Sequence, residues 1–202
     1  MNLLTFDCGT SPLAWSLLHL DKDKLCSGNY REGIIIKQCN IRYMLPDGKI
    51  STLSIEERQN IITTTIMDIR DEVKDEHIDK VIIEEQLSPK CKASNSTIPF
   101  EVSIALFSIF RSSNYSVVFV SSDLKGKLVF DNVPTPVQKY RSKHYKNKVE
   151  ACHKLDIILG YIGDTKIIKL PKDKKNHIAD CILQAIAWTI SSTSSPLLCT
   201  YQ

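Results

Sequence analysis

Two carboxylates, Asp7 and Glu84, stand where runs of apolar residues end, and both are therefore placed to do chemistry. Asp7 follows the mostly apolar stretch 3–6 and precedes Gly9, while Glu84 follows the stretch 81–83. Such runs predict buried strands that deliver a carboxylate to their C-terminal tips. Burying a carboxylate costs several kcal/mol unless a cation or a donor compensates it, so each needs a partner. For Asp7 taken alone, capping the following turn and binding a ligand are equally good interpretations.

A second pair of candidates lies near the other end of the chain, where His177 precedes Asp180 by three residues. The periodicity there is helical, so both side chains lie on one face of a helix. Together with the two strand-end carboxylates, they could converge on divalent cations. Hard oxygen ligands suit Mg²⁺ or Mn²⁺, and a single imidazole slightly favours Mn²⁺. Two such ions a few ångströms apart can activate a water and stabilise the leaving oxygen in phosphodiester cleavage.

Hydrophobic periodicity indicates which elements would position these residues. Strands are predicted over 3–7, 13–20, 33–37, 80–84 and 116–120. Helices are predicted over 55–74 after a capping box at Ser54 and Glu57, from Pro99 to Phe110, over 142–159 with Gly160 as C-cap, and from Asn176 to Trp188. Polar turns are predicted at 21–24 and 45–49, and three strands joined by short turns indicate an antiparallel meander. This order predicts an α/β fold with a mixed five-stranded sheet, in which ligands bind at the C-terminal ends of strands.

Length and composition are those of a globular domain. The chain has 202 residues, 43% apolar and 24% charged, which predicts one domain over 1–190 and a flexible tail over 191–202. No apolar run approaches the ~20 residues of a membrane span, and no secretory leader is evident at the N-terminus. The seven cysteines form no C-x-x-C pair, which disfavours structural zinc and indicates free thiols in a reducing, intracellular compartment.

Charge is spread unevenly along the chain, although the net charge is only +3. Residues 121–175 hold 13 Lys and Arg against 6 Asp and Glu, whereas the rest of the chain holds 13 against 17. A basic third on an otherwise mildly acidic protein is a plausible footprint for a polyanion.

Three segments, taken in order, resemble the RuvC-type Holliday junction resolvases, and above all their poxvirus and fungal mitochondrial branch. They are Phe6-Asp7-Cys8-Gly9-Thr10 with Leu13-Ala14-Trp15, then Ile83-Glu84, and finally Lys174-Lys175-Asn176-His177-Ile178-Ala179-Asp180. The resemblance covers the chain from Leu3 to Trp188. It implies a ribonuclease H-like fold, a homodimer, and an endonuclease that uses two Mg²⁺ or Mn²⁺ ions to resolve four-way DNA junctions in recombination or replication. For a poxvirus-like protein it implies processing of viral genome concatemers in the host cytoplasm.

The resemblance also implies a role for each carboxylate. Carried over by position, Asp7 would bridge the two metals, Glu84 would hold one of them and Asp180 the other. Glu85 is the alternative to Glu84 as the metal ligand. A central strand is buried on both faces, so the alternation of its side chains does not choose between the two glutamates.

The chain departs from the family pattern in the last segment. The poxvirus-like pattern has two aspartates where this chain has Asn176 and His177. Some bacterial RuvC proteins have a histidine three residues before the last aspartate, and an imidazole can coordinate metal. His177 is therefore placed in the site, with a helix-capping or surface histidine as the alternative.

Eight lysines are candidates for contacts with DNA phosphates beside such a site. For the run at 143–148, a solvated helix face is the alternative. The candidates are Lys90, Lys92, Lys143, Lys146, Lys148, Lys172, Lys174 and Lys175.

Three further functions are compatible with parts of the pattern. One is another ribonuclease H-like nuclease that acts on RNA–DNA hybrids or rRNA precursors. A second is an ATP-binding protein of the actin and sugar-kinase superfamily, for which one domain with 7 glycines leaves little room. The third is a module that binds branched DNA without cutting it. Metal-dependent cleavage of a synthetic junction would distinguish a resolvase from such a module.

Overall fold

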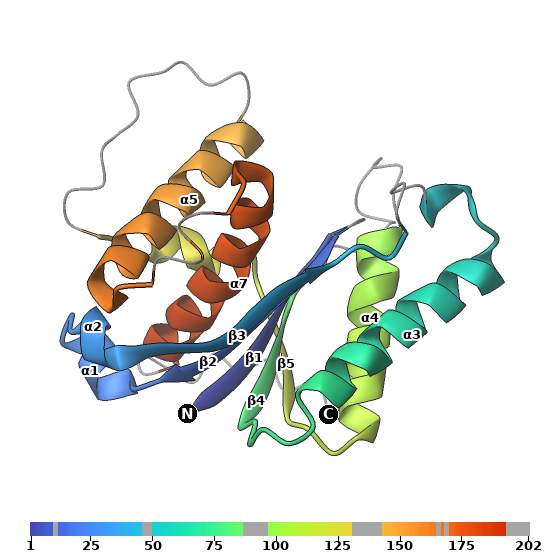
Figure 1. Ribbon diagram of the computed structural model, residues 1–202, viewed down its shortest axis with the longest axis horizontal. Helices are drawn as coiled ribbons and strands as arrows, with labels where there is room; N and C mark the ends of the chain where they lie inside the picture. The colour runs from blue at the N-terminus through green and yellow to red at the C-terminus, as the bar shows by residue number, and fades with distance from the viewer. Residues whose placement is uncertain are drawn as a thin grey trace.

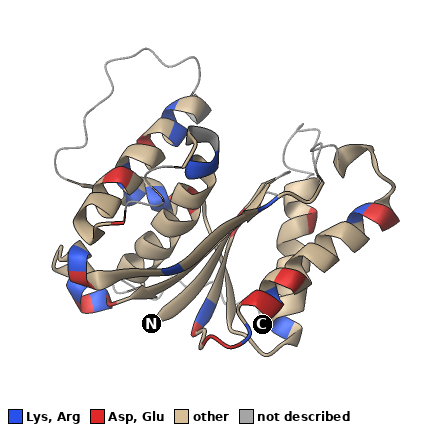
Figure 2. Ribbon diagram, in the orientation of Figure 1, with Lys and Arg blue, Asp and Glu red and all other residues tan. Residues whose placement is uncertain are grey.

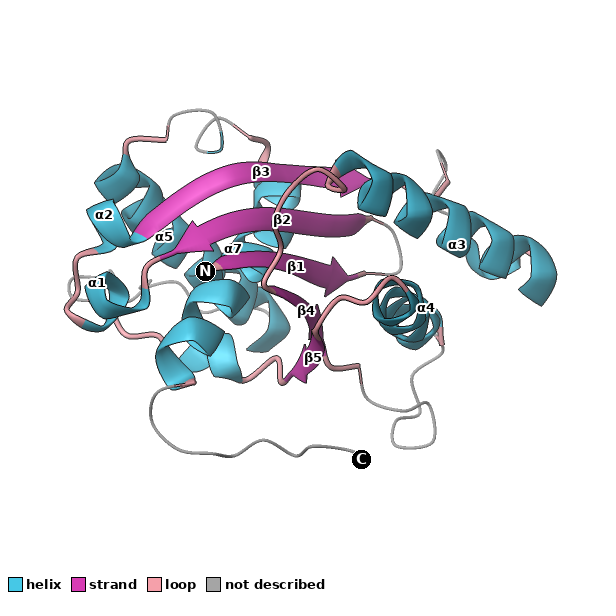
Figure 3. Cartoon of the chain, turned by 90° about the horizontal axis from the view of Figure 1, so that it is seen from below, coloured by secondary structure: helices cyan, strands magenta, loops and turns pink. Residues whose placement is uncertain are grey.

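A mixed sheet of five strands forms the centre of the computed structural model, which describes residues 1–9, 12–45, 50–86, 97–130, 143–164, 167 and 170–192 (Figure 1). The strands are β1 (Asn2–Cys8), β2 (Leu13–Leu20), β3 (Ile34–Arg42), β4 (Lys80–Glu84) and β5 (Val117–Val120). Their order across the sheet is β3-β2-β1-β4-β5, as Figure 3 shows. The first three strands are antiparallel neighbours, whereas β4 and β5 run parallel to β1. The predicted mixed sheet is confirmed.

Two pairs of helices cover opposite faces of this sheet (Figure 1). One face carries α5 (Lys143–Ile162) and α7 (Lys172–Ser191), and the other carries α3 (Ile55–Glu72) and α4 (Ile98–Ser112). Successive side chains of a strand point to opposite faces, so the central strands contribute to two separate cores. In β1, Leu3 packs in the cluster under α5 and α7, while Leu4 and Phe6 pack in the cluster under α3 and α4.

The helix signals on the α3 and α4 side are confirmed. The Ser54 hydroxyl accepts a hydrogen bond from the Glu57 amide at 3.2 Å, and the Glu57 carboxylate accepts one from the Ser54 amide at 3.0 Å. This capping box satisfies donors that the first turn of a helix leaves unpaired. Pro99 lies in the first turn of α4, where its missing N–H is no loss.

Several element boundaries differ from the prediction, and the strand expected over 33–37, for example, continues to Arg42 as β3. The segment 21–24, expected as a turn, begins the short helix α1 (Lys22–Cys26), because the Asp21 side chain accepts hydrogen bonds from two amides of its first turn. It is followed by α2 (Tyr30–Gly33). Helix α5 continues through Gly160 and ends before Gly163, whose φ of +75° suits glycine. Helix α7 begins at Lys172, one turn before the predicted start.

Two sequence predictions fall mostly on residues outside the described ranges. They are the turn core at 46–49 and the tail from 193. Among the described residues, none of the five cysteines forms a disulfide. No helix in the described part of the chain is long and apolar enough to span a membrane.

Candidate active site

The two strand-end carboxylates lie side by side because their strands are parallel neighbours. Phe6 in β1 pairs with Ile83 in β4, so the residues that follow them, Asp7 and Glu84, reach the same edge of the sheet. The C-terminal edge of parallel strands is where α/β sheets place their ligands. The structure therefore brings together two residues that are 77 positions apart in the sequence.

Alternation along β1 turns Asp7 toward helix α7. Leu3 packs under α5 and α7, and the hydroxyl of Thr5 donates a hydrogen bond to the carbonyl of Cys181 in α7 at 3.1 Å. Residues two apart on a strand share a face, so Asp7 continues this row. This hydrogen bond links α7 to β1. The residues just before Cys181 therefore lie over the end of the strand.

Alternation along β4 decides between the two glutamates. Ile82 belongs to the cluster under α5 and α7, so Glu84 faces α7 as well. Its side chain is only 13% exposed, whereas Glu85 is an exposed residue. Glu84 is thus the glutamate that the structure places beside Asp7.

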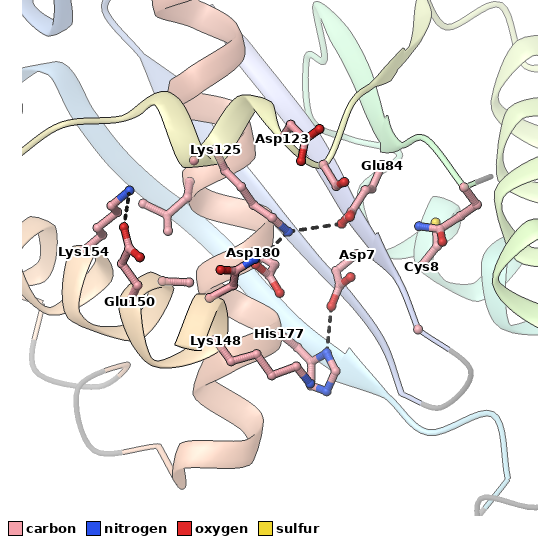
Figure 4. A pocket seen from close by; sticks show the side chains of 17 residues that line it. Asp7, Cys8, Glu84, Asp123, Lys125, Lys148, Glu150, Lys154, His177 and Asp180 are labelled. Atoms are coloured by element: carbon pink, nitrogen blue, oxygen red, sulfur yellow. Dashed lines mark hydrogen bonds and ion pairs between the residues drawn. The ribbon is translucent and has the colours of Figure 1, made fainter. Parts of the chain in front are cut away.

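All four predicted site residues line one pocket of about 610 Å³ (Figure 4). They come from β1, β4 and α7, and they are Asp7, Glu84, His177 and Asp180. The Nδ1 atom of His177 lies 2.7 Å from Oδ2 of Asp7, which is hydrogen-bond distance. The histidine is therefore neither a helix cap nor a surface residue, but a direct partner of the central aspartate.

A lysine that the sequence reasoning missed lies among these carboxylates. Lys125 belongs to the short 3-10 helix Leu124–Lys127, which follows β5. Its Nζ lies 2.7 Å from Oδ1 of Asp180 and 3.4 Å from Oε2 of Glu84, as the dashed lines of Figure 4 show. The signal that could have found it is positional, since it follows the end of the strand next to β4.

Burial dominates the electrostatics of the cluster. It raises the pKa of Glu84 to about 7; Lys125 opposes this rise, and the charges of Asp7 and Asp180 add to it. Burial also raises the pKa of Asp180, again against the effect of Lys125. Burial alone would lower the pKa of Lys125, but the attraction of Asp180 and Glu84 outweighs it and the pKa is raised. The three carboxylates thus share too little positive charge.

The donor set fits a hard divalent cation, although the side chains are not gathered around one. Three carboxylates and an imidazole are ligands that Mg²⁺ and Mn²⁺ accept. In the described part of the chain, however, no three His, Cys, Asp or Glu side chains stand close enough together to hold one ion. The ammonium of Lys125 lies between Glu84 and Asp180 instead.

The predicted DNA-contacting lysines are distributed unequally around the pocket. Lys148 lines the pocket from α5, and Lys146, two residues earlier on the same helix, is exposed. Lys174 is half-buried and does not line the pocket. Lys175 is buried and forms an ion pair with Asp156 of α5, so it joins the two helices and does not reach the pocket. In this arrangement Lys175 is therefore not placed for the predicted contact with a DNA phosphate in the pocket.

The other four predicted lysines cannot be placed in the same way. Two of them lie outside the described residues. The other two lie at helix ends whose backbone is described but whose side chains are not. They are Lys90, Lys92, Lys143 and Lys172. A further lysine, Lys154, was not predicted; it is 6% exposed, lines the pocket from α5 and pairs with Glu150.

Comparisons with known proteins give matches only among solved structures, since no protein-family model and no curated protein matches the chain. Thermus thermophilus RuvC in complex with a Holliday junction substrate matches with a TM-score of 0.58 and 12% identity, over 96% of this chain and 97% of that chain. Fowlpox virus resolvase, in complex with its substrate Holliday junction DNA, matches with a TM-score of 0.56 and 13% identity, over 96% of this chain and 100% of that chain. The yeast mitochondrial Holliday junction resolvase Ydc2 matches with a TM-score of 0.59 and 10% identity, over 95% of this chain and 78% of that chain. At these identities the matches show the fold, and the chain has the ribonuclease H-like fold of the RuvC-type resolvases.

Proposed function

We propose that this protein is a metal-dependent endonuclease that resolves four-way DNA junctions. The observation that carries the proposal is the convergence of Asp7, Glu84, His177 and Asp180 in one pocket at the C-terminal edge of the central parallel strands. The fold supports it, because two of the matching structures hold a Holliday junction. The biological setting would be recombination or replication, including the processing of viral genome concatemers.

The chain's own residues would divide the work in the pocket. Asp7 would be a ligand shared by two cations, with Glu84 and Asp180 each holding one of them. His177 would complete the coordination and orient Asp7 through their 2.7 Å contact. The bound cations would supply the positive charge that activates water and stabilises the leaving oxygen. The pocket walls would hold the scissile phosphate in line with these groups.

The DNA would approach along the basic side of the pocket. Figure 2 shows lysines on the N-terminal halves of α5 and α7, next to the edge where β1 ends. Lys146 is exposed and Lys148 lines the pocket, so both are placed for phosphate contacts. Contacts of this kind supply most of the affinity for DNA and make it salt-dependent.

We expect the protein to act as a homodimer, because resolution requires two cuts related by a two-fold axis. The side of α4 and β5 offers apolar surface for such contact. Ile104 is 44% exposed, and Phe119 on the edge strand β5 is 40% exposed and stacks on Phe107 with ring centroids 5.4 Å apart. An Ile104→Glu variant should sediment as a monomer where the wild type sediments as a dimer.

A second candidate function is recognition of branched DNA without cleavage. The observation that favours it is Lys125, which occupies the space between two of the three carboxylates. A third possibility, cleavage of an RNA–DNA hybrid, uses the same pocket on a single duplex and requires no dimer.

One experiment separates these functions. The purified protein is incubated with a synthetic four-way junction, a linear duplex of the same sequence and an RNA–DNA hybrid, with Mg²⁺, with Mn²⁺ or with EDTA. A resolvase makes paired, metal-dependent cuts in the junction and binds the linear duplex much more weakly. Binding of the junction without cuts favours the second function. Cleavage of the hybrid alone favours the third, and equal affinity for both DNAs would contradict the resolvase proposal.

A further inference from the structure

Lys125 is the single lysine or arginine, among the described residues, that forms an ion pair with a carboxylate of the candidate metal site. Its ammonium contacts Asp180 at 2.7 Å and Glu84 at 3.4 Å, and its side chain is 20% exposed (Figure 4). The third carboxylate, Asp7, has His177 as its partner instead. The position of Lys125 is thus the one between the groups that would hold the ions.

The charges of the site favour a cation in this position. Carboxylates gathered in a half-buried pocket repel one another, and the repulsion is strong where water is scarce. Lys125 offsets part of it, but a single ammonium cannot form short contacts with Glu84 and Asp180 and leave room for a cation bound to the same oxygens. The ammonium and the divalent cation therefore compete for one space.

We propose that Lys125 is an internal counter-ion that closes the metal site of the metal-free protein and that divalent cations must displace it. This inference rests on the metal-dependent function proposed above. It makes Lys125 a positioning residue with two states, one paired with Glu84 and Asp180 and one turned away. In the first state the lysine stabilises the empty site, and in the second it releases the oxygens for the ions.

The surroundings of Lys125 allow its side chain to move while the backbone stays in place. Leu128 is buried in the cluster under α5 and α7, and Leu124 packs against that cluster, so both ends of the short 3-10 helix are anchored. A lysine side chain has four rotatable bonds and can swing its ammonium by several ångströms. The Lys125 side chain is 20% exposed, so part of it borders on solvent.

Direct measurement of metal affinity tests the displacement. Isothermal titration calorimetry with Mg²⁺ and with Ca²⁺, in the absence of DNA, compares the wild type with Lys125→Met and Lys127→Met. Lys127 lies in the same 3-10 helix and is exposed, so its variant removes an equal charge without opening the site. We expect Lys125→Met to bind the ions about tenfold more tightly, since a competing ammonium is lost. Lys127→Met should bind as the wild type does, and equal affinities for all three proteins would overturn the proposal.

The wild-type protein provides a second test that does not depend on the folding of a variant. In a sample labelled with ¹⁵N at the lysine ammonium groups, Lys125 should give a signal separate from the exposed lysines, because it is held in two ion pairs. Saturation with Ca²⁺ should move this signal to the position of the exposed lysines. A Lys125 signal that stays unchanged in saturating Ca²⁺ would show that the lysine is not displaced.

The two proposals fail in different ways. If the wild type binds metal and cuts junctions, but Lys125→Met binds metal no more tightly, only the counter-ion role is wrong. If neither the wild type nor Lys125→Met takes up any metal and no junction is cut, the metal-dependent function is wrong and the counter-ion role falls with it.

Discussion

Two glutamates of this molecule have similarly small exposed fractions, yet the pKa values of their carboxylates shift in opposite directions. Glu101 joins α4 to α3 and its side chain is 18% exposed, while Glu84 lies in the pocket and is 13% exposed. Burial alone would raise the pKa of Glu101, but hydrogen bonds from Arg58 and other donors lower it below its usual value. For Glu84, burial prevails over Lys125 and the pKa is raised to about 7.

The difference lies in how deeply each carboxylate lies in the protein, which is far deeper for Glu84, and in the number and type of its donors. Glu101 accepts two hydrogen bonds from the Arg58 guanidinium, at 2.6 and 2.9 Å, one from Thr97 at 2.7 Å and one from Gln59 at 3.2 Å. Glu84 shares the ammonium of Lys125 with a second carboxylate. A structural carboxylate is thus satisfied by its neighbours, whereas the pocket carboxylates keep a deficit of positive charge that a bound cation would fill.

The largest expected effect tests the functional side of this comparison. Asp7→Asn should reduce junction cleavage by on the order of a thousandfold, because a group central to the charge of the site loses that charge. Junction binding should change little, since affinity comes mainly from lysine–phosphate contacts. Cleavage rates and gel-shift affinities of the same preparations measure the two effects. Glu85→Gln, a change at the exposed neighbour of Glu84, is the control and should cut normally.

Equal losses of cleavage and of binding in Asp7→Asn would show that Asp7 has a structural role. Loss of cleavage in Glu85→Gln, with Glu84→Gln still active, would reverse the assignment that strand alternation gives to the two glutamates.

The pH dependence of stability should reveal the raised pKa of Glu84. In the metal-free protein Glu84 binds a proton up to about pH 7, whereas a free glutamate releases it near 4.5. The folded state thus holds more protons than the unfolded state between these two pH values. The contribution of Glu84 to the free energy of unfolding is therefore fully present below about pH 4.5 and is lost as the pH rises through about 7. The loss should be on the order of 3 kcal/mol, because the pKa differs by about 2.5 units between the two states. Urea denaturation in EDTA at several pH values, with Glu84→Gln for comparison, measures it.

The Glu84→Gln variant should lack this part of the pH dependence, because the amide does not titrate. Superimposable stability curves for Glu84→Gln and the wild type between pH 4.5 and 7 would show that the pocket does not raise the pKa of Glu84.

A matched substitution at Glu101 should affect stability and spare activity. Glu101→Gln should lower the free energy of unfolding by about 2 kcal/mol at neutral pH, because charge-assisted hydrogen bonds to Arg58 are weakened. Its contribution has the opposite pH dependence to that of Glu84: it is present above the ordinary glutamate pKa and is lost in acid. Junction cleavage by this variant at 25 °C should equal that of the wild type. A cleavage defect as large as that of Asp7→Asn would contradict a purely structural role.

The smallest expected effect concerns His177. His177→Asp should keep cleavage activity and use Mg²⁺ better relative to Mn²⁺, because a hard oxygen replaces a softer nitrogen beside Asp7. Rates measured with each ion at saturating concentration give the ratio for both proteins. An active variant with an unchanged ratio would remove His177 from the metal site.

Much of the fold could be predicted from the sequence because its signals are local. The apolar runs before Asp7 and Glu84, the capping box at Ser54 and Glu57, and Pro99 at the start of a helix all report backbone preferences of neighbouring residues. Each of these elements is where the pattern predicts it. Element ends were less accurate, because signals such as Gly160 compete with others, and in the structure Gly163 ends the helix.

Strand alternation by itself determined that Glu84 and Glu85 face opposite sides of β4, and the chain order determined that both carboxylates end central strands. The choice between the two glutamates required the tertiary structure, because only one face of the sheet carries α7. Lys125 likewise lies in a short 3-10 helix with no periodic pattern, and only the folding of that helix against α7 brings its ammonium to Asp180. A local pattern fixes the direction of a side chain, but its partner is set by packing between distant segments.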